Sequence, residues 1–592
     1  MRYSHRALYF ILIVALLLIE KIDLVAQVIS VSPIPQRIDV PRDGALVVEF
    51  AAAIDPATVN SNSFLAFGRW SGVMDGSFSF ENGNQQARFQ PVREFSAGEY
   101  VTVNLSSDIA FADGTPLTHG YTWNFWAKAD PGSLELQEIA RIPVRQPGEG
   151  HIQTYGAFAG DLNEDGYSDY SVPNELANDV RVFLNDGQGG YSSFTAFPLP
   201  GGSVPSTNEG ADFNRDGHID FVVGNIGNSL ATVYLGDGNG GFLSITSYTA
   251  GQSIRGITVL DAEGDGDIDI VSANYSANNL ALLLNDGSGV FGSPQTFESG
   301  GNGERAVAAA DVNDDGIGDL IVGVFNSNEL LMLLGDGSGG YALSDRISVG
   351  GSPWMLAIGD INGDGTLDVA SANSSNNSAS AAFTDGQGNF INAVSYSSGG
   401  TFPLAIDLGD LDGDGDLDLL VSNFGNFGSN NGRWRCYEND GDGNFINPAD
   451  YPASKAASCA VFHDRDRDGD LDLTCIDELD DLLFIFEPLP LSLPHPGDPP
   501  SDFALGQNYP NPFNPLTNFG FRISDFGFVK LEIFDLSGRK IRTLRSEPMV
   551  PGTYETQWDG RDDVGALMAS GVYLYRLQAG ALSQVRKMVL VR

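Results

Sequence analysis

Between residues 134 and 487 the chain alternates short apolar runs with polar turns at a regular spacing. Runs such as WMLAIGD, LDVASAN and SASAAFT are 5–8 residues long, rich in β-forming residues and bounded by Gly, Asn or Ser. Runs of this length with such boundaries indicate β-strands rather than helices. Four of them occupy each unit of about 50 residues, so the pattern predicts an all-β protein built from repeats.

An acidic nine-residue segment follows the first run of every unit. Its starts lie 51, 49, 50, 49, 50 and 54 residues apart, which chance does not produce. The seven copies are DLNEDGYSD from Asp161, DFNRDGHID from Asp212, DAEGDGDID from Asp261, DVNDDGIGD from Asp311, DINGDGTLD from Asp360, DLDGDGDLD from Asp410 and DRDRDGDLD from Asp464.

A second motif, Asp-Gly followed by Gly and usually an aromatic residue, travels with the first and predicts a hairpin turn. Its aspartate lies 25 residues after the start of the acidic segment in the first five units, and 30 after it in the sixth, which has an insertion around FGSNNG. Each unit therefore predicts four antiparallel strands in the order strand, acidic loop, strand, loop, strand, Asp-Gly turn, strand. Four-stranded units repeated radially make a β-propeller, and seven copies predict seven blades.

The two ends of the repeat region predict how the ring closes. The seventh unit lacks the Asp-Gly turn and the fourth strand before the chain reaches the proline-rich EPLPLSLPHPGDPP. The run SLELQEIARIPV precedes the first unit, where a fourth strand would be needed. We therefore expect residues 134–145 to supply the outer strand of blade seven, which removes two exposed sheet edges.

The formal net charge of −45 excludes a nucleic-acid-binding protein, because that class needs a basic surface. The seven acidic loops hold 29 of the 77 acidic residues and three basic ones, so the charge is concentrated rather than spread. Solvated acidic turns are one interpretation, but they do not explain the fixed spacing. The six histidines have no ligand-like spacing, so a zinc or haem site has no support.

The loop pattern D-x-[DNE]-x-D-G-x-x-D predicts a calcium site. The first, third, fifth and ninth positions supply side-chain oxygens, the sixth-position glycine permits a sharp turn, and the seventh offers its backbone carbonyl. Hard oxygen ligands in a flexible loop suit Ca²⁺ better than Mg²⁺. Seven bound ions would reduce the formal charge to −31. The candidate ligands are Asp161, Asn163, Asp165, Tyr167, Asp169, Asp212, Asn214, Asp216, His218, Asp220, Asp261, Glu263, Asp265, Asp267, Asp269, Asp311, Asn313, Asp315, Ile317, Asp319, Asp360, Asn362, Asp364, Thr366, Asp368, Asp410, Asp412, Asp414, Asp416, Asp418, Asp464, Asp466, Asp468, Asp470 and Asp472.

An EF-hand is excluded, because it needs an acidic residue at the twelfth position and flanking helices. The twelfth residue here is Val, Ser or Cys and lies inside a predicted strand. Glu263 has a longer arm than the Asp or Asn found at the third position elsewhere, which makes loop three the least regular.

These loops, their period and their turns resemble the FG-GAP/VCBS repeats of integrin α-chain propellers and many bacterial surface proteins, over residues 134–487. The resemblance implies that calcium is structural, with up to seven ions, and that ligands dock on the face opposite the calcium loops. Loops such as GQSIRG, GNGERA, GGSPWM and GGTFPL would form that face. Arg255, Arg305, Trp354 and Phe402 are its candidate carbohydrate- or peptide-binding residues, although ordinary loop packing also accounts for them.

Two further modules flank the repeats. Residues 28–129, with the elements IDPATVN and YTWNFWA, predict a small sandwich and resemble bacterial Ig-like domains of the SbsA type. Residues 488–502 form a proline-rich linker. Residues 503–592, with NYPNPFNP, DLSGRK and ASGVYLYRL, resemble the type A C-terminal sorting domain of the type IX secretion system, which has a FlgD-like Ig fold. That resemblance implies that the export machinery is a partner; a third Ig-like spacer is the alternative.

The first 27 residues predict a secretory signal peptide. Arg2 and Arg6 precede a 13-residue apolar run from Ala7 to Ile19, which is short for a membrane span. A retained anchor is the alternative. The three cysteines form no disulfide framework, although Cys459 and Cys475 flank one acidic loop and are candidates for a pair.

Together these features predict a secreted or cell-surface calcium-binding protein whose role is adhesion or ligand binding rather than catalysis. No GxSxG, HExxH or histidine-based dyad is present, and the densest carboxylate clusters are explained by metal loops. An extracellular polysaccharide lyase or hydrolase on a propeller scaffold and a structural surface stalk are the alternatives. No nucleic-acid partner is expected, nor a transmembrane span after signal cleavage.

Overall fold

The computed structural model describes residues 27–489 and most of 504–591, with gaps at 507, 509–510, 512, 524–526, 536–537, 551 and 580–581. The predicted signal peptide and linker fall almost entirely outside the described residues. The described residues up to Leu489 form one compact unit, and those from 504 onward form a second. Regular structure in these residues is β-strand apart from one short 3-10 helix, η1 (Pro56–Thr58), so the all-β expectation is confirmed. Across the same residues, no helix has the length and apolarity to cross a bilayer.

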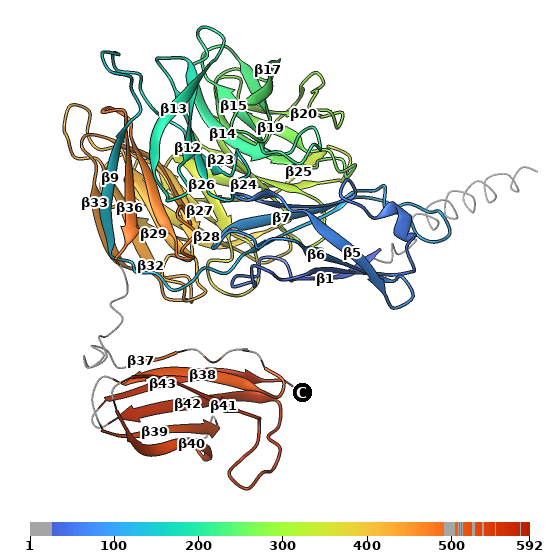
Figure 1. The fold of residues 1–592 in the computed structure, drawn as a ribbon, viewed down its shortest axis with the longest axis vertical. Coiled ribbons are helices and arrows are strands. Elements are labelled where there is room, and N and C mark those ends of the chain that lie inside the picture. Colours follow the sequence, from blue (N-terminus) through green and yellow to red (C-terminus); the bar gives the residue numbers. More distant parts are fainter. Residues whose placement is uncertain are drawn as a thin grey trace, which may run out of the picture. The chain divides into compact units, whose positions relative to one another are not determined.

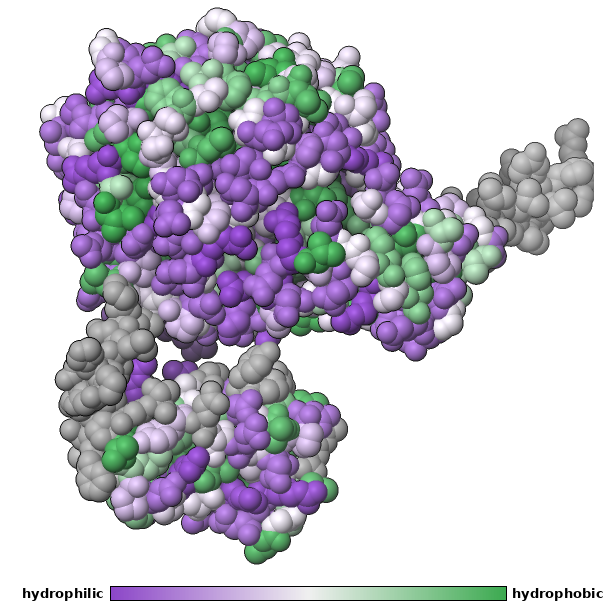
Figure 2. All heavy atoms as spheres, viewed as in Figure 1, coloured by the Kyte–Doolittle hydropathy of each residue, from purple (hydrophilic) through white to green (hydrophobic). Residues whose placement is uncertain are grey.

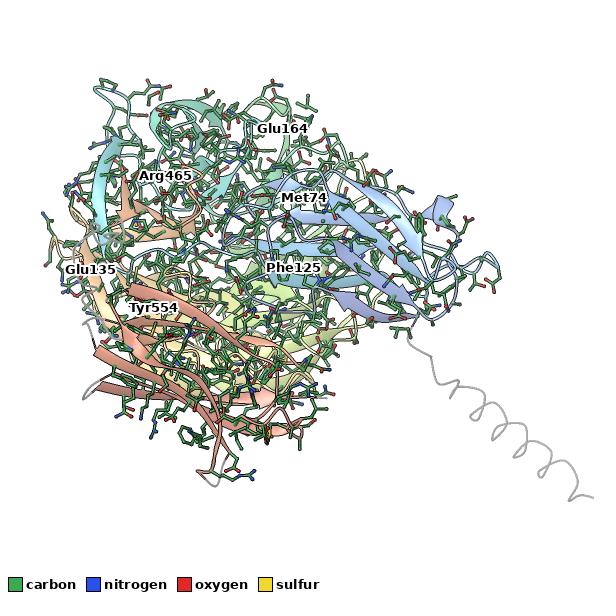
Figure 3. All side chains as sticks on the ribbon, turned by 60° about the horizontal axis from the view of Figure 1, so that its bottom comes forward. Met74, Phe125, Glu135, Glu164, Arg465 and Tyr554 are labelled. Carbon is green, nitrogen blue, oxygen red and sulfur yellow. The ribbon has the colours of Figure 1, made fainter. Side chains whose placement is uncertain are left out.

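The N-terminal module is a sandwich of two four-stranded sheets, ordered β1-β2-β6-β5 and β4-β3-β7-β8. Alternate side chains point inward, as in β2, where Leu46, Val48 and Phe50 are buried and Glu49 is exposed. Phe125, on β8, is fully buried in this core (Figure 3). The strands are β1 (Val28–Ser32), β2 (Leu46–Phe50), β3 (Phe64–Gly68), β4 (Gly72–Val73), β5 (Gly76–Glu81), β6 (Gln86–Pro91), β7 (Tyr100–Leu105) and β8 (Tyr121–Trp126).

The repeat region folds into seven four-stranded antiparallel sheets, and six of them contain four strands consecutive in the chain (Figure 1). Those six are β10 (Phe158–Gly160), β11 (Asp169–Asn174), β12 (Asp179–Asn185), β13 (Tyr191–Pro198); β14 (Pro205–Ala211), β15 (Asp220–Asn225), β16 (Leu230–Gly236), β17 (Phe242–Thr249); β18 (Ile254–Leu260), β19 (Asp269–Asn274), β20 (Asn279–Leu283), β21 (Gln295–Phe297); β22 (Glu304–Ala310), β23 (Asp319–Val324), β24 (Glu329–Gly335), β25 (Tyr341–Ser348); β26 (Pro353–Gly359), β27 (Asp368–Asn373), β28 (Ser378–Thr384), β29 (Phe390–Ser397); and β30 (Pro403–Gly409), β31 (Asp418–Asn423), β32 (Arg433–Asn439), β33 (Phe445–Pro452).

The seventh sheet joins the two ends of the repeat region. It contains β34 (Ala457–His463), β35 (Asp472–Asp477), β36 (Leu482–Pro488) and, as its outer strand, β9 (Leu136–Pro143). β9 pairs with β36 in antiparallel register, with Leu482 opposite Pro143 and Pro488 opposite Leu136. A strand that precedes the first repeat therefore completes the last blade.

The innermost strands pack against one another around the ring. β14 packs on β18, β18 on β22, β22 on β26, β26 on β30 and β30 on β34, while β10 contacts both β14 and β34. The second strand of every sheet is buried along its whole length, because it is covered by neighbours within its own sheet and by the adjacent sheets. The outer strands alternate between exposed and half-buried positions, which is what a closed propeller predicts.

The C-terminal unit is a second small sandwich around a core of its own, which includes Phe519, Trp558 and Tyr575. Its sheets are ordered β37-β38-β41 and β40-β39-β42-β43. The strands are β37 (Ala504–Leu505), β38 (Thr517–Ile523), β39 (Gly527–Asp535), β40 (Lys540–Met549), β41 (Gly552–Trp558), β42 (Gly571–Ala579) and β43 (Leu582–Leu590).

Candidate metal loops and the opposite face

The seven acidic loops lie at one end of the propeller, because each joins the innermost strand of its sheet to the second strand. In the first sheet, β10 ends at Gly160 and β11 begins at Asp169, so the ninth-position aspartate is already the first residue of the second strand. The same arrangement recurs in every blade. We call this end the loop face, and the opposite end, where the chain enters each innermost strand, the mouth face.

The first aspartate is buried in six of the loops and half-buried in loop three, and it closes the turn. In six loops its Oδ2 accepts the backbone N–H of the sixth-position glycine at 2.7–3.1 Å. All seven of these glycines have φ between 81° and 100°, a region that favours glycine, so the sequence prediction of a sharp turn at this position is explained. The loops are therefore shaped by the residues that were predicted to bind the ion.

Three of the first aspartates carry an oxygen that has no partner. Oδ1 of Asp161, Asp410 and Asp464 is buried and makes no hydrogen bond within the described chain. A buried polar atom without a partner is costly, and a carboxylate oxygen more so. These atoms are placed where a cation would remove the cost.

The carboxylates of two loops converge. Asp410, Asp412 and Asp414 bring one oxygen each to within 4.8 Å of one another, and so do Asp464, Asp466 and Asp468. In loops one, two and four the third position is Asn, whose amide nitrogen donates to the fifth-position aspartate at 2.8–3.1 Å. The first, third and fifth positions thus face a shared space in two loops, and the third and fifth positions meet in three more.

The ninth aspartate has a second role that sequence reasoning missed. Its Oδ2 accepts the N–H of the second loop residue in all seven blades, at 2.8–3.2 Å. In blades one to six its Oδ1 accepts an N–H at the end of the third strand, for example that of Asn185 in blade one, at 2.6–3.0 Å. This carboxylate ties the loop to the third strand, while each oxygen keeps a lone pair for an ion.

Burial raises the pKa of these carboxyl groups. The pKa of Asp161 rises to about 6 and that of Asp311 to about 8, because desolvation disfavours the charged form. The pKa of Asp169, at the ninth position, also rises to about 8. Burial and the neighbouring carboxylate of Asp414 raise the pKa of Asp412 to about 7. Protons and a metal ion would therefore compete for the same oxygens near neutral pH.

Two loops already contain a cation. Arg215 of loop two contacts Asp267 of loop three at 2.5 Å, so the seventh residue of loop three is paired with its neighbour. Arg465 of loop seven is buried, lies 3.6 Å from Asp472 and pairs with Glu487 (Figure 3). His218 of loop two pairs with Glu164 of loop one, which raises the pKa of the imidazole. Loop three is therefore the least dependent on a bound ion, whereas in loop seven Arg465 contacts the ninth aspartate and Oδ1 of Asp464 still lacks a partner.

The N-terminal sandwich covers part of the loop face, which sequence reasoning did not predict. Its backbone N–H groups donate to loop carbonyls at 2.8 Å: Ser107 to Gly264, Thr122 to Gly316 and Asp130 to Gly469. In return, Asp161 of loop one donates its N–H to the carbonyl of Trp70, also at 2.8 Å. The candidate metal loops are therefore part of a domain interface.

One side chain of the sandwich reaches the central channel of the ring. Arg69 Nη1 lies 3.1 Å from Oδ1 of Asp407, on the innermost strand of blade six. Burial raises the pKa of the nearby Glu209 to about 7, and the charge of Arg69 opposes that rise. A cavity of about 210 Å³ remains between β3, β7 and β8 of the sandwich and the channel wall. The channel is thus covered by the sandwich at the loop face.

The four predicted ligand residues lie together at the mouth face. The Arg305 guanidinium is 3.1 Å from the centroid of the Trp354 ring, and the Trp354 and Phe402 rings are 5.0 Å apart. Arg255 and Trp354 line the same hollow of the channel. Arg305 is only 4% exposed, whereas the other three are half-buried.

Two residues at the mouth face, Tyr155 and Phe427, were not predicted from the sequence as ligand residues. Tyr155 accepts a hydrogen bond from Trp354 Nε1 at 2.8 Å, and it stands six residues before its acidic loop, the same repeat position as Arg255, Arg305 and Trp354. Comparing this repeat position across the units would therefore have identified Tyr155 from the sequence. Phe427 is 79% exposed and lies 6.2 Å from Phe402, in the insertion of unit six.

The possible pairing of Cys459 with Cys475 is wrong. Both are free thiols, as is Cys436, and all three are buried. The strand partner of Cys475 is Ala460, so the side chain of the preceding residue, Cys459, points to the other side of the sheet. Two cysteines on opposite faces cannot form a disulfide.

The comparisons with known families agree with this architecture. Residues 161–223, 212–272, 261–322, 311–371 and 360–421 match the FG-GAP-like repeat. Residues 25–126 match a bacterial Ig-like domain, and residues 517–582 match the FlgD Ig-like domain. The chain therefore contains an FG-GAP-repeat propeller with an Ig-like domain on either side. No curated protein matches the chain.

Solved structures with a similar course of the chain share little sequence. A crystal structure of BBS1N in complex with ARL6DN, soaked with lead, has a TM-score of 0.42 and 15% identity, covering 60% of this chain and 98% of that one. The Dos1 propeller has a TM-score of 0.36 and 9% identity, covering 60% and 95%. A functionally unknown protein from Desulfotomaculum acetoxidans DSM 771 has a TM-score of 0.35 and 12% identity, covering 64% and 96%.

Proposed function

We propose that the protein is a calcium-braced binding protein of the cell surface, exported by the type IX secretion system, that holds a glycan or protein ligand at the mouth face. The observation that carries this proposal is the loop chemistry. Buried carboxylate oxygens without partners, in loops of fixed geometry, fit a hard cation bound by oxygen atoms.

The ligands of each ion would be the side chains at the first, third, fifth and ninth positions and the carbonyl at the seventh. The bound Ca²⁺ would supply the positive charge that the buried carboxylates lack. Extracellular calcium modules bind at roughly 10⁻⁴–10⁻³ M, so such loops would fill outside the cell and not in a low-calcium cytoplasm. At 1 mM calcium, a site with a dissociation constant of 10⁻⁴ M would stabilise the fold by about 1.4 kcal/mol.

The mouth face is the proposed ligand face because the N-terminal sandwich covers part of the loop face. The mouth instead presents arginine and aromatic side chains around the channel opening, including Arg255, Trp354 and the exposed Phe427. A glycan and protein-ligand array probed with the calcium-saturated protein tests the binding role. Binding that is lost on addition of EGTA supports it, and an array without signal contradicts it.

The export route is supported by the C-terminal sequence. The segment NYPNPFNP opens a domain whose later residues match a FlgD Ig-like fold, and residues 503–592 form a unit separate from the propeller. We expect a variant truncated after residue 502 to accumulate in the periplasm with an intact propeller. If the truncated protein still reached the cell surface, the assignment of a sorting domain would be wrong.

A further inference from the structure

Two arginines at the mouth face have buried guanidinium nitrogens without a hydrogen-bond partner, although Arg305 also stacks on aromatic rings. Nε and Nη2 of Arg305 and Nε of Arg255 are buried and make no hydrogen bond within the described chain. Neither residue forms an ion pair among the described residues, although acidic residues outnumber basic ones by 77 to 32. Burial, together with the smaller effect of the nearby positive charge of Arg255, lowers the pKa of Arg305 to about 9. An anion at this position would satisfy both groups.

The acidic residues nearby supply that anion only in part: the charges of Arg255 and Arg305 oppose the rise that burial causes in the pKa of Glu175, but neither arginine forms an ion pair with it among the described residues. Gln153 Nε2 donates to Glu175 at 2.6 Å and to Glu478 at 3.2 Å, so one amide group holds both side chains. Glu478 is 5% exposed, and burial together with the charge of Glu175 raises its pKa to about 8. Its carboxyl group therefore remains largely neutral at pH 7, and the two arginines are left without a full counter-charge.

An aromatic ledge adjoins the arginines. Phe402, Phe424 and Phe427 contact one another with ring centroids 5.0–6.2 Å apart, and Trp354 extends the ledge toward Arg305. Phe427 is exposed and Phe402 and Trp354 are half-buried, so these rings are placed to pack against the aliphatic face of a sugar ring, while Phe424 is buried.

Several of the remaining mouth loops are uncharged and polar, among them SANYSANN and SANSSNN, whereas the loop from Asp477 to Asp481 is acidic. Amide and hydroxyl groups suit sugar hydroxyls. An acidic peptide would instead need several unpaired basic residues along its length, and at the mouth Arg145 and Lys455 are already paired with Asp481 and Asp480.

From these observations we infer that the mouth face binds a saccharide that carries a carboxylate, of the uronic-acid class, with the carboxylate at Arg255 and Arg305 and the sugar rings on the aromatic ledge. This inference rests on the proposed binding function and specifies its ligand. Its distinguishing feature is that the charge of the sugar, and not its shape alone, determines the affinity.

The test uses the calcium-saturated mature protein and a panel of hyaluronan, alginate and polygalacturonate oligosaccharides, each paired with its carboxyl-reduced form. We expect at least one acidic oligosaccharide to bind and its reduced form to bind at least tenfold more weakly, measured by isothermal titration calorimetry. A hexaglutamate peptide tests the alternative anionic ligand. Equal affinity for reduced and unreduced sugars, or binding of the peptide in their place, would overturn the inference.

Variants locate the site. Arg255→Gln and Arg305→Gln should each weaken binding of the acidic sugar about tenfold or more, since a hydrogen bond to a charged group is worth about 1.5–3 kcal/mol. Arg141→Gln, on the outer strand β9 and paired with Glu138, is the matched control and should bind as wild type. Because Arg305 is buried, the Arg305→Gln variant can misfold. Arg255 is half-buried, so Arg255→Gln is the second variant in which the loss of binding is measured. If binding were unchanged in Arg255→Gln, the carboxylate would not lie where we place it.

The outcomes separate this inference from the proposed function. Binding of neutral glycans alone, or of proteins on the array, would leave the binding role intact and reject the carboxylate. An absence of binding to all glycans and proteins would reject both.

Discussion

The guanidinium of Arg69 lies 3.1 Å from Oδ1 of Asp407 and so joins the N-terminal sandwich to the innermost strand of blade six. Asp407 is 7% exposed at its side chain, and Glu209 is close enough to influence both groups. The Ig-like domain inserts a charged side chain into the propeller channel. It is therefore an integral part of the propeller unit. It is not a spacer on a flexible tether.

Replacing Arg69 should loosen this junction. Arg69→Met leaves Asp407 and Glu209 without a cation, and we expect a loss of about 1–3 kcal/mol in the free energy of unfolding, because a charge that loses its partner in a partly buried site is penalised. Arg88→Met, half-buried on β6 of the same sandwich and without an ion pair among the described residues, is the control. Chemical denaturation measures both variants, and equal stabilities would show that the pair contributes nothing.

Calcium removal should release the sandwich from the loops. The amides of Ser107, Thr122 and Asp130 donate to loop carbonyls, so they depend on the loops keeping their shape. We expect hydrogen exchange at these three amides to accelerate at least tenfold in EGTA, while amides paired inside the sandwich, such as that of Val103 on β7, keep their protection. Equal exchange rates at these three amides with and without calcium would show that the interface does not depend on the bound metal.

Charge removal in a single loop should reduce the stabilisation by calcium without destabilising the calcium-free protein. Asp410→Asn keeps the size of the side chain but removes a buried charge whose Oδ1 has no partner. We expect the melting temperature in EGTA to be equal to or higher than that of the wild type, and the increase caused by calcium to be smaller by the contribution of one site. Asp442→Asn, exposed in the Asp-Gly turn of the same blade, should behave as wild type. A lower melting temperature in EGTA alone would instead indicate a purely structural carboxylate.

The stability of the calcium-free protein should decrease as pH rises. The folded-state pKa values of Asp161 and Asp311, about 6 and 8, are above the value near 3.8 of an unfolded chain, so the folded state binds more protons between these limits. Stability is therefore lost from about pH 4 upward until the folded-state pKa is passed. The melting temperature in EGTA should fall from pH 5 to pH 8, and the stabilisation by calcium should be larger at pH 8. A calcium effect of equal size at both pH values would contradict this linkage.

The fold was largely predictable because the same sequence pattern recurs in every unit of the repeat region. Apolar runs, acidic loops and Asp-Gly turns recur every 50 residues, so each four-stranded sheet is specified several times over. The missing fourth strand of the last unit and the extra run before the first indicated a closed ring, and β9 occupies that outer position. The sandwiches were recognisable from alternating apolar residues and from short family motifs.

The contacts between modules were not predictable. The N-terminal sandwich binds the loops through backbone N–H and carbonyl groups, which every residue has, so no sequence pattern indicates the interface. Asp169 and its equivalents were predicted as ion ligands only, because their bonds to the third strand span a separation of about 16 residues. The exposed Phe427 lies in an insertion that occurs once, where repeats offer no comparison.

The most direct test of the account is the number of calcium ions that the purified mature protein retains. After equilibrium dialysis against about 1 mM calcium, in the range at which extracellular modules bind, we predict that metal analysis finds close to seven ions per chain, with loop three the first to lose its ion as the concentration falls. A protein that retains no calcium above the level of the dialysis buffer would contradict the account, and the acidic loops would then be stabilised by their hydrogen bonds and protons alone.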